Sequence, residues 1–138
     1  MKVVPGFEIF GGIVLNRGVG RLKAEAVLRI AQIGGGGRIV WLPTFAAENT
    51  VRVSVEKRAY VSVVRAGRPV PELSEIFSVI AKHDLVLTTG RSAADESLVL
   101  IQAAKRAGVK PILLTHVLSP ELPRPLVRCW RWQIREHF

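Results

Sequence analysis

The sequence predicts an α/β protein built on a parallel sheet, and three observations lead to that prediction. Four short apolar runs lie along the chain without polar alternation, as expected of strands that are buried on both faces. Helical patterns separate these runs, and strict alternation of strand and helix favours parallel strands joined by right-handed crossovers. The polar residues that end the runs recur at similar intervals, because 28 residues separate Asn16 from Thr44 and 26 separate Thr89 from Thr115.

Length and composition predict one folded domain. The chain has 138 residues, of which 49% are hydrophobic, and this is enough apolar material for a single core. A complete (β/α)8 barrel needs about 250 residues and does not fit. We therefore expect a single α/β domain over 1–138, with an insertion at 45–70 and a divergent C-terminal segment at 119–138.

Each predicted element rests on a local pattern. The predicted strands cover 13–16, 39–44, 85–89 and 112–116, and the predicted helices cover 23–33, 71–82 and 92–108. Pro71 is a favoured first helical residue, and apolar side chains follow it at helical spacing. Ser92 and Asp95 resemble a capping box at the start of the last helix, and Gly108 ends it.

Two segments do not follow the repeating pattern. The 45–70 insertion is predicted to form a small ribbon or hairpin over the carboxyl ends of the strands, from the apolar residues Val51, Val53 and Val55 and then Tyr60, Val61, Val63 and Val64. After residue 118 the prolines exclude a long helix before 125. An amphipathic terminal helix is expected beyond that point, with a strand over 132–138 as the alternative.

Charge and cysteine content limit the partners and the compartment. Lys and Arg number 20 against 11 acidic residues, a net charge of +9, yet the arginines are scattered and no nucleic-acid-binding motif occurs. Cys129 is the only cysteine, so no internal disulfide can form. No leader or membrane segment is recognised. We expect a cytoplasmic protein with a small-molecule ligand and without nucleic-acid or membrane partners.

Polar residues at the predicted strand ends are the first candidate site. In a parallel sheet such residues meet at one rim; here they are Asn16, Thr44, Thr89, Arg91, Thr115 and His116. The alternative is that Thr and Asn only end the strands and cap the turns. His116 is a candidate metal ligand or proton carrier. His83 and His137 do not lie at strand ends, so the sequence reveals no cluster of three ligands.

A glycine-containing turn is the second candidate site. Arg17, Gly18, Gly20 and Arg21 lie between a predicted strand and a helix, where backbone amides and two cations could hold a phosphate. The third glycine of a dinucleotide-binding turn is replaced by Lys23. The alternative is a flexible turn without a ligand.

Several of these segments together resemble a metal-dependent hydrolase-like family of the amidohydrolase superfamily. They are 10–16, 40–44, 71–73, 80–90 and 113–116, in the family's order. The resemblance implies a partial (β/α)8-barrel-like arrangement of four or five parallel strands with crossover helices, equivalent to strands three to six. It also implies that His116 matches the metal ligand ending the sixth strand. Arg91 stands where the family has the fifth-strand histidine.

The departures from that family lead to two functional hypotheses. A guanidinium beside a divalent cation is costly, since two unit charges 4 Å apart interact by about 4 kcal/mol near a protein surface. The resemblance therefore implies a truncated, divergent amidohydrolase-like protein that lacks metal-dependent hydrolysis on its own. No cofactor is expected for this chain alone, and a divalent metal such as zinc is expected only if the family site is retained. The alternative is a small α/β module that binds an anion or a phosphate ligand, and the sequence leaves the choice between enzyme and binding protein open.

A partial barrel has two uncovered sheet edges. The sequence therefore predicts one of three outcomes: an open sandwich with helices on both faces, self-association through the open edges, or a marginally stable product.

Overall fold

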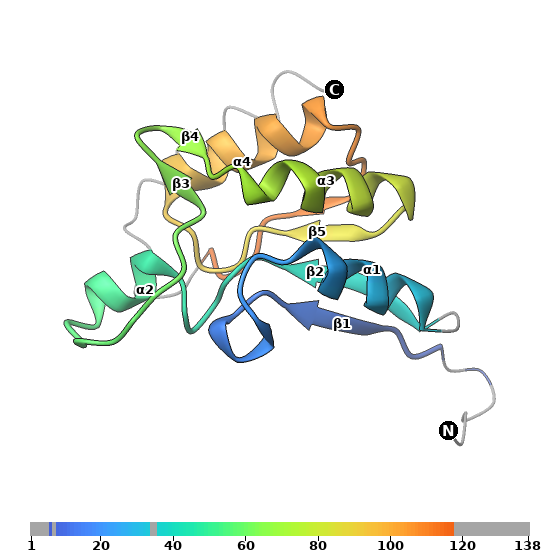
Figure 1. Cartoon of the computed structure of the whole chain (residues 1–138), viewed down its shortest axis with the longest axis horizontal. Helices are drawn as coiled ribbons and strands as arrows, with labels where there is room; N and C mark the ends of the chain where they lie inside the picture. The colour runs from blue at the N-terminus through green and yellow to red at the C-terminus, as the bar shows by residue number, and fades with distance from the viewer. Residues whose placement is uncertain (1–5, 7, 34–35, 118–138) are drawn as a thin grey trace.

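The computed structural model describes residues 6, 8–33 and 36–117 of the chain (Figure 1). Within these residues a four-stranded sheet, a small hairpin and the helices follow one another in chain order. They are β1 (Gly11–Val14), the 3-10 helix η1 (Arg17–Val19), α1 (Ala24–Gln32), β2 (Gly37–Trp41), α2 (Glu48–Val53), β3 (Val64–Arg65), β4 (Arg68–Pro69), α3 (Glu72–Lys82), β5 (Val86–Thr88), α4 (Ala94–Arg106) and β6 (Ile112–Leu113).

The main sheet has the strand order β1-β2-β5-β6, and every neighbouring pair is parallel. Each crossover adds the next strand on the same side of the previous one. The predicted α/β class with a parallel sheet is confirmed, and the part of the chain that the structure describes contains four strands of it.

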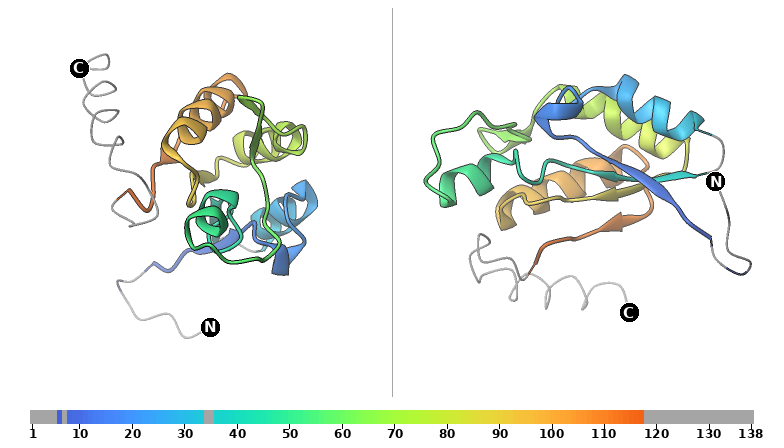
Figure 2. Two further views of the ribbon diagram at one scale, coloured as in Figure 1. Left: turned by 90° about the vertical axis from the view of Figure 1, so that its left-hand side faces the viewer. Right: turned by 90° about the horizontal axis from the view of Figure 1, so that it is seen from below.

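One face of the sheet carries the hydrophobic core. Ile13, Val40, Leu87 and Ile112 lie in register across the four strands and belong to the core cluster or pack against it. The helical side chains of this cluster come from all three crossover helices: Ala24 and Val27 of α1, Leu73, Ile76, Phe77 and Ile80 of α3, and Leu100 and Ala104 of α4. These helices therefore lie along the same face of the sheet (Figure 2).

The described residues thus differ from the open sandwich that was one of the expected outcomes. Successive strands that are added in one direction through right-handed crossovers place every crossover helix on one side of a sheet. A sandwich with helices on both faces needs the strand order to reverse, and here it does not.

The opposite face has a row of its own. Val14, Trp41, Thr88 and Leu113 are in register across the sheet. The indole ring of Trp41 lies against Gly12, where an added Cβ would collide with it. Leu113, on the edge strand β6, is 53% exposed.

The prediction of a ribbon over Val51 to Val55 was wrong in part. Residues 48–53 form the short helix α2, in which Thr50 and Val51 are buried and Val53 is exposed. The residue pattern favoured a strand because valine is β-branched, but none of the strands in the described part of the chain includes these residues. A hairpin does occur later in the same insertion, where β3 pairs antiparallel with β4.

The predicted capping box was displaced by one residue. Helix α4 has Ala93 as its N-cap, and the backbone N–H of Ala93 donates to Oε2 of Glu96 at 2.8 Å. The Ser92 hydroxyl donates to the carbonyl of Thr89 at 2.9 Å instead. Ser92 is therefore used by the strand-to-helix turn, and Glu96 takes the place that the sequence assigned to Asp95.

The terminal segment 119–138, with its alternatives of helix or strand, lies outside the described residues. Among the helices that the structure describes, none has the length and apolarity needed to cross a membrane.

Candidate functional site

The strand-end rim, which we define as Asn16, Thr44, Thr89, Arg91, Thr115 and His116, is held together mainly by its own hydrogen bonds. Oδ1 of Asn16 accepts the N–H groups of Thr44 at 3.0 Å and Ala46 at 3.2 Å. Nδ2 of Asn16 donates to Oγ1 of Thr44 at 3.0 Å. Both lone-pair positions of the amide oxygen are thus occupied. Asn16 acts as a clamp between the end of β1 and the loop after β2.

Thr89 and Thr115 form a second link across the rim. The N–H of Thr115 donates to Oγ1 of Thr89 at 3.2 Å, and the Thr115 hydroxyl donates to the carbonyl of Gly90 at 3.3 Å. Thr89 is 1% exposed. The predicted convergence of these residues is found, but their polar atoms contact one another and little of them faces solvent.

Arg91 is fixed at the centre of the rim. Its N–H donates to the carbonyl of Pro43 at 3.0 Å, and its carbonyl accepts from Nδ2 of Asn49 at 3.4 Å. Its guanidinium carbon lies 4.8 Å from the centre of the exposed Phe45 ring, a cation–π contact. The backbone approach requires Gly90, because an added Cβ there would collide with the carbonyls of Leu42 and Pro43.

His116 lies on an exposed turn at the end of this rim. Its φ of 60° is in the left-handed region, three residues after Leu113, where β6 ends. In residues 6, 8–33 and 36–117, no three His, Cys, Asp or Glu side chains come together in a group able to hold a metal ion. The donor set around His116 therefore does not fit a divalent metal within this part of the chain.

The glycine-containing turn uses most of its amides internally. The N–H groups of Val19 and Arg21 donate to the carbonyl of Asn16, and that of Gly20 donates to the carbonyl of Arg17. These amides cannot form the phosphate cradle that the Gly-x-Gly spacing suggested. Helix α1 starts only at Ala24, after Lys23.

The same turn nevertheless lines a pocket with positive side chains, which we call the basic pocket. It has a volume of about 270 Å³ and is bordered by Gly20, Arg21, Leu22, Lys23, Tyr60, Val61, Ser62, Arg65 and Glu72. Arg21 and Lys23 come from the β1–α1 loop, whereas Arg65 comes from the insertion between β2 and α3. Arg17 and Gly18, the other two predicted anion-binding residues, do not line it.

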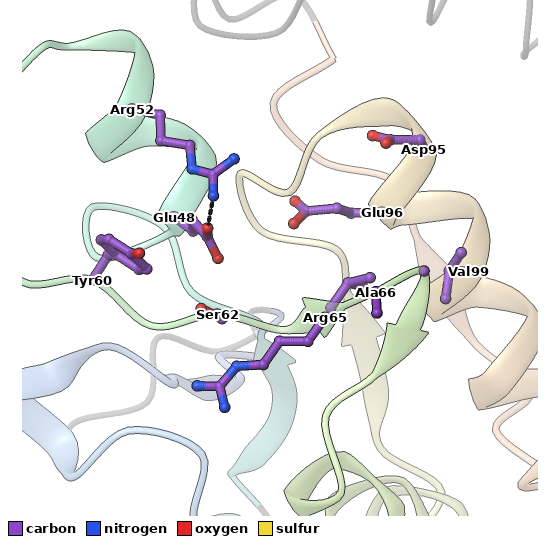
Figure 3. A pocket seen from close by; sticks show the side chains of 11 residues that line it. Glu48, Arg52, Tyr60, Ser62, Arg65, Ala66, Asp95, Glu96 and Val99 are labelled. Carbon is purple, nitrogen blue, oxygen red and sulfur yellow. Dashed lines mark ion pairs between the residues drawn. The ribbon is translucent and has the colours of Figure 1, made fainter.

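A larger hollow, which we call the acidic cleft, adjoins the insertion. Its volume is about 710 Å³, and its lining residues are Glu48, Arg52, Tyr60, Ser62, Val64, Arg65, Ala66, Gly67, Asp95, Glu96 and Val99. This size is typical of small-molecule sites. Figure 3 shows Glu96 extending from α4 into the space that faces α2, where Glu48 and Arg52 lie.

Two carboxylates of the acidic cleft differ in their surroundings. Glu48 forms an ion pair with Arg52 one turn further along α2. The pKa of Glu96 is raised above its ordinary value, chiefly by burial, and the neighbouring Glu48 and Asp95 raise it further. The N–H of Ala93 and the charge of Arg52 act in the opposite direction. A cation bound beside Glu96 would therefore stabilise the charged form of its carboxylate.

The sequence interpretation missed most residues of these two pockets. Tyr60, Ser62 and Arg65 lie in the insertion, whose residue pattern carried no chemical motif. Asp95 was assigned only to a capping box at the start of a helix, and no role in a site was assigned to Asp95 or Glu96. Their shared location depends on how the insertion crosses the carboxyl ends of the strands (Figure 1), and no local spacing encodes that path.

Fold and pockets together define a class: a parallel α/β protein whose described crossover helices cover one sheet face and whose ligand-sized hollows adjoin the carboxyl ends of the strands. The chain belongs to a family of unknown function, DUF6282, whose model matches residues 1–129. Searches of curated proteins and of solved structures gave no match.

Proposed function

We propose that this protein is a small-molecule-binding α/β module that holds a phosphate-bearing anion in the basic pocket. The observation that carries the proposal is the meeting of Arg21, Lys23 and Arg65 around one hollow. Three like charges from two separate loops repel one another, so an anion between them relieves that repulsion.

The charge of the basic pocket favours phosphate over a carboxylate. Three cations and one acid, Glu72, leave a net charge of +2, which suits the dianion of a phosphate monoester. The hydroxyl groups of Ser62 and Tyr60 border the same space and can donate hydrogen bonds to phosphate oxygens. The pocket also adjoins the loop that follows β1, at the edge where parallel α/β proteins commonly bind ligands.

We also propose that the fold is a divergent partial barrel related to the amidohydrolase superfamily, without metal-dependent hydrolysis by this chain alone. The one-directional strand order and the helices on one face support the partial barrel. His116 at the end of β6 supports the relationship, and Arg91 at the place of a ligand supports the lost activity. Elemental analysis of purified protein for zinc tests the last point, and stoichiometric zinc would overturn it.

Self-association through the sheet edges stays a prediction of the partial barrel. Among the described strands, β1 and β6 each have one neighbour, and such edges can pair with another chain. Light scattering checks it, and a monomer at all concentrations would contradict it.

Isothermal titration with inorganic phosphate tests the anion site. Lys23→Ala and Arg65→Ala should each weaken binding roughly tenfold to hundredfold, because a hydrogen bond to a charged group contributes about 1.5–3 kcal/mol. Arg17→Ala is the matched control, since Arg17 lies in the same β1–α1 loop as Arg21 and Lys23 and does not line the pocket. Saturable binding that survives Lys23→Ala and Arg65→Ala, or no phosphate binding by the unmodified protein, would overturn the proposal.

A further inference from the structure

The basic pocket and the acidic cleft adjoin each other. Tyr60, Ser62 and Arg65 line both hollows, so the 60–65 segment forms the boundary between them. Arg65 extends from the hairpin away from Glu96 and toward the β1–α1 segment (Figure 3). The basic pocket is lined by three cations and one acid, whereas the acidic cleft is lined by three carboxylates and two cations, of which Arg65 extends toward the basic pocket.

The acidic cleft has the groups that recognise an organic cation. It is lined by three carboxylates, of which Glu48 is already paired with Arg52. Asp95 and Glu96 lie on α4, across from that ion pair, and the aromatic ring of Tyr60 borders the same space. Carboxylates and an aromatic face are the two chemistries that bind a protonated amine.

A metal ion is a poorer occupant of the acidic cleft. The described residues of the cleft do not form a group of three ligands able to hold one. A primary ammonium needs no fixed coordination number and carries a single charge.

We propose that the natural ligand is zwitterionic, an aminoalkyl phosphate whose phosphate occupies the basic pocket and whose protonated amine reaches the acidic cleft beside Glu96. This inference rests on the proposed phosphate-binding function and adds the second half of the ligand. A ligand of this kind places opposite charges in the two hollows at once. It also explains why Arg65 and Ser62 border both.

Paired probes separate the two halves of the inference. O-phosphoethanolamine and 3-aminopropyl phosphate differ in the length of the chain between phosphate and amine. Their counterparts without the amine are ethyl phosphate and propyl phosphate, respectively. We expect the unmodified protein to bind at least one amine-bearing probe about tenfold more tightly than its counterpart in calorimetric titrations. Ethanolamine without phosphate should bind weakly, because it occupies only one hollow.

Glu96→Gln should remove this preference and leave the affinity for the alkyl phosphates unchanged. Glutamine retains an oxygen that can accept the N–H of Ala93, so the start of α4 is preserved. Glu75→Gln is the matched control, because Glu75 lies on the exposed face of α3 and lines neither hollow. Circular dichroism of each variant checks that it is folded.

Each outcome of this experiment decides something. Alkyl phosphate binding without an amine preference would overturn the zwitterion inference and leave the phosphate site standing. An amine preference that persists in Glu96→Gln would also overturn it, since the cation would then lie elsewhere. Failure of every phosphate-bearing probe to bind would overturn both proposals.

Discussion

The strand-end rim and the acidic cleft both contain clusters of polar side chains, yet the two regions use them differently. In the rim, Asn16, Thr89 and Thr115 hydrogen-bond to neighbouring loops, and Thr89 is almost fully buried. In the cleft, Glu96, Tyr60 and Arg65 border open space. Polar residues at strand ends therefore stabilise the loops here. The groups able to contact a ligand lie on the insertion and on α4.

This difference has a simple energetic basis. A buried loop must satisfy its backbone N–H and carbonyl groups, and an unsatisfied one costs about 1–3 kcal/mol. Short polar side chains at the ends of strands are the nearest partners for such groups. Longer side chains on the insertion and on α4 can reach into a pocket, and Glu96 does so while its Oε2 also accepts the N–H of Ala93.

The largest effect should come from Gly90→Ala at the rim. Gly90 has a φ of 63°, and an added Cβ would collide with the carbonyls of Leu42 and Pro43. We expect a loss of more than about 2 kcal/mol of unfolding free energy, because left-handed backbone costs roughly 1–2 kcal/mol before the collision is counted. Gly67→Ala is the control: its φ is 70°, but the space around it is open. Urea denaturation measures both, and equal losses would show that the rim is not tightly packed.

Asn16→Ala should have the next largest effect. It removes the acceptor for the N–H groups of Thr44 and Ala46, and we expect a loss of about 2 kcal/mol in urea denaturation. Asn16→Asp keeps an acceptor for these groups and should recover much of the stability. If Asn16→Ala unfolds at the same urea concentration as the unmodified protein, the hydrogen bonds of Asn16 do not hold the loop, and Asn16 would become a candidate for a direct role in binding.

Arg52→Met in the acidic cleft should lower the free energy of unfolding by only about 0.5 kcal/mol. The Arg52 side chain is 71% exposed and that of Glu48 is 13% exposed, and ion pairs with a solvent-exposed partner contribute little. The same urea measurement checks it. A loss as large as that of Asn16→Ala would mean that the cleft, like the rim, is a structural network.

The smallest expected effect is a change in pH dependence with Glu96→Gln. Burial raises the pKa of Glu96 above 4.5, so the folded protein favours the protonated carboxyl. The resulting stabilisation is complete below pH 4.5 and is lost as pH rises through the folded pKa. Glu96→Gln should lack this decline. Stability measured from pH 4 to 8 tests it, and a wild-type protein that gains stability over Glu96→Gln with rising pH would contradict it.

Residue patterns predicted the repeating part of the fold well. The apolar runs located all four strands of the sheet to within a few residues, and helical spacing located α3, whose Leu73, Ile76 and Ile80 are fully buried. The convergence of Asn16 with Thr44 and of Thr89 with Thr115 also followed from the strand ends. These predictions succeeded because buried strands appear in the sequence as continuous apolar runs, and a buried helical stripe appears as apolar residues at helical spacing.

The insertion was harder to predict for a physical reason. Val51 and Val53 favour a strand locally, yet the segment forms α2, in which Thr50 and Val51 are buried. At the start of α4 the sequence favoured Ser92 as the N-cap, but the Ser92 hydroxyl donates to the carbonyl of Thr89, and the N-cap is Ala93. Such choices depend on partners distant in sequence, which local propensity cannot weigh.

The sequence by itself determined the parallel α/β class, the order of strands and helices, and the residues that end each strand, because hydrophobic periodicity and turn residues act locally. Only the tertiary structure decided that the described helices cover one face, that the rim residues bond to one another, and that Arg65 separates a basic pocket from an acidic cleft. Those outcomes depend on the direction of the crossovers and on the path of the insertion, both of which are set by long-range packing.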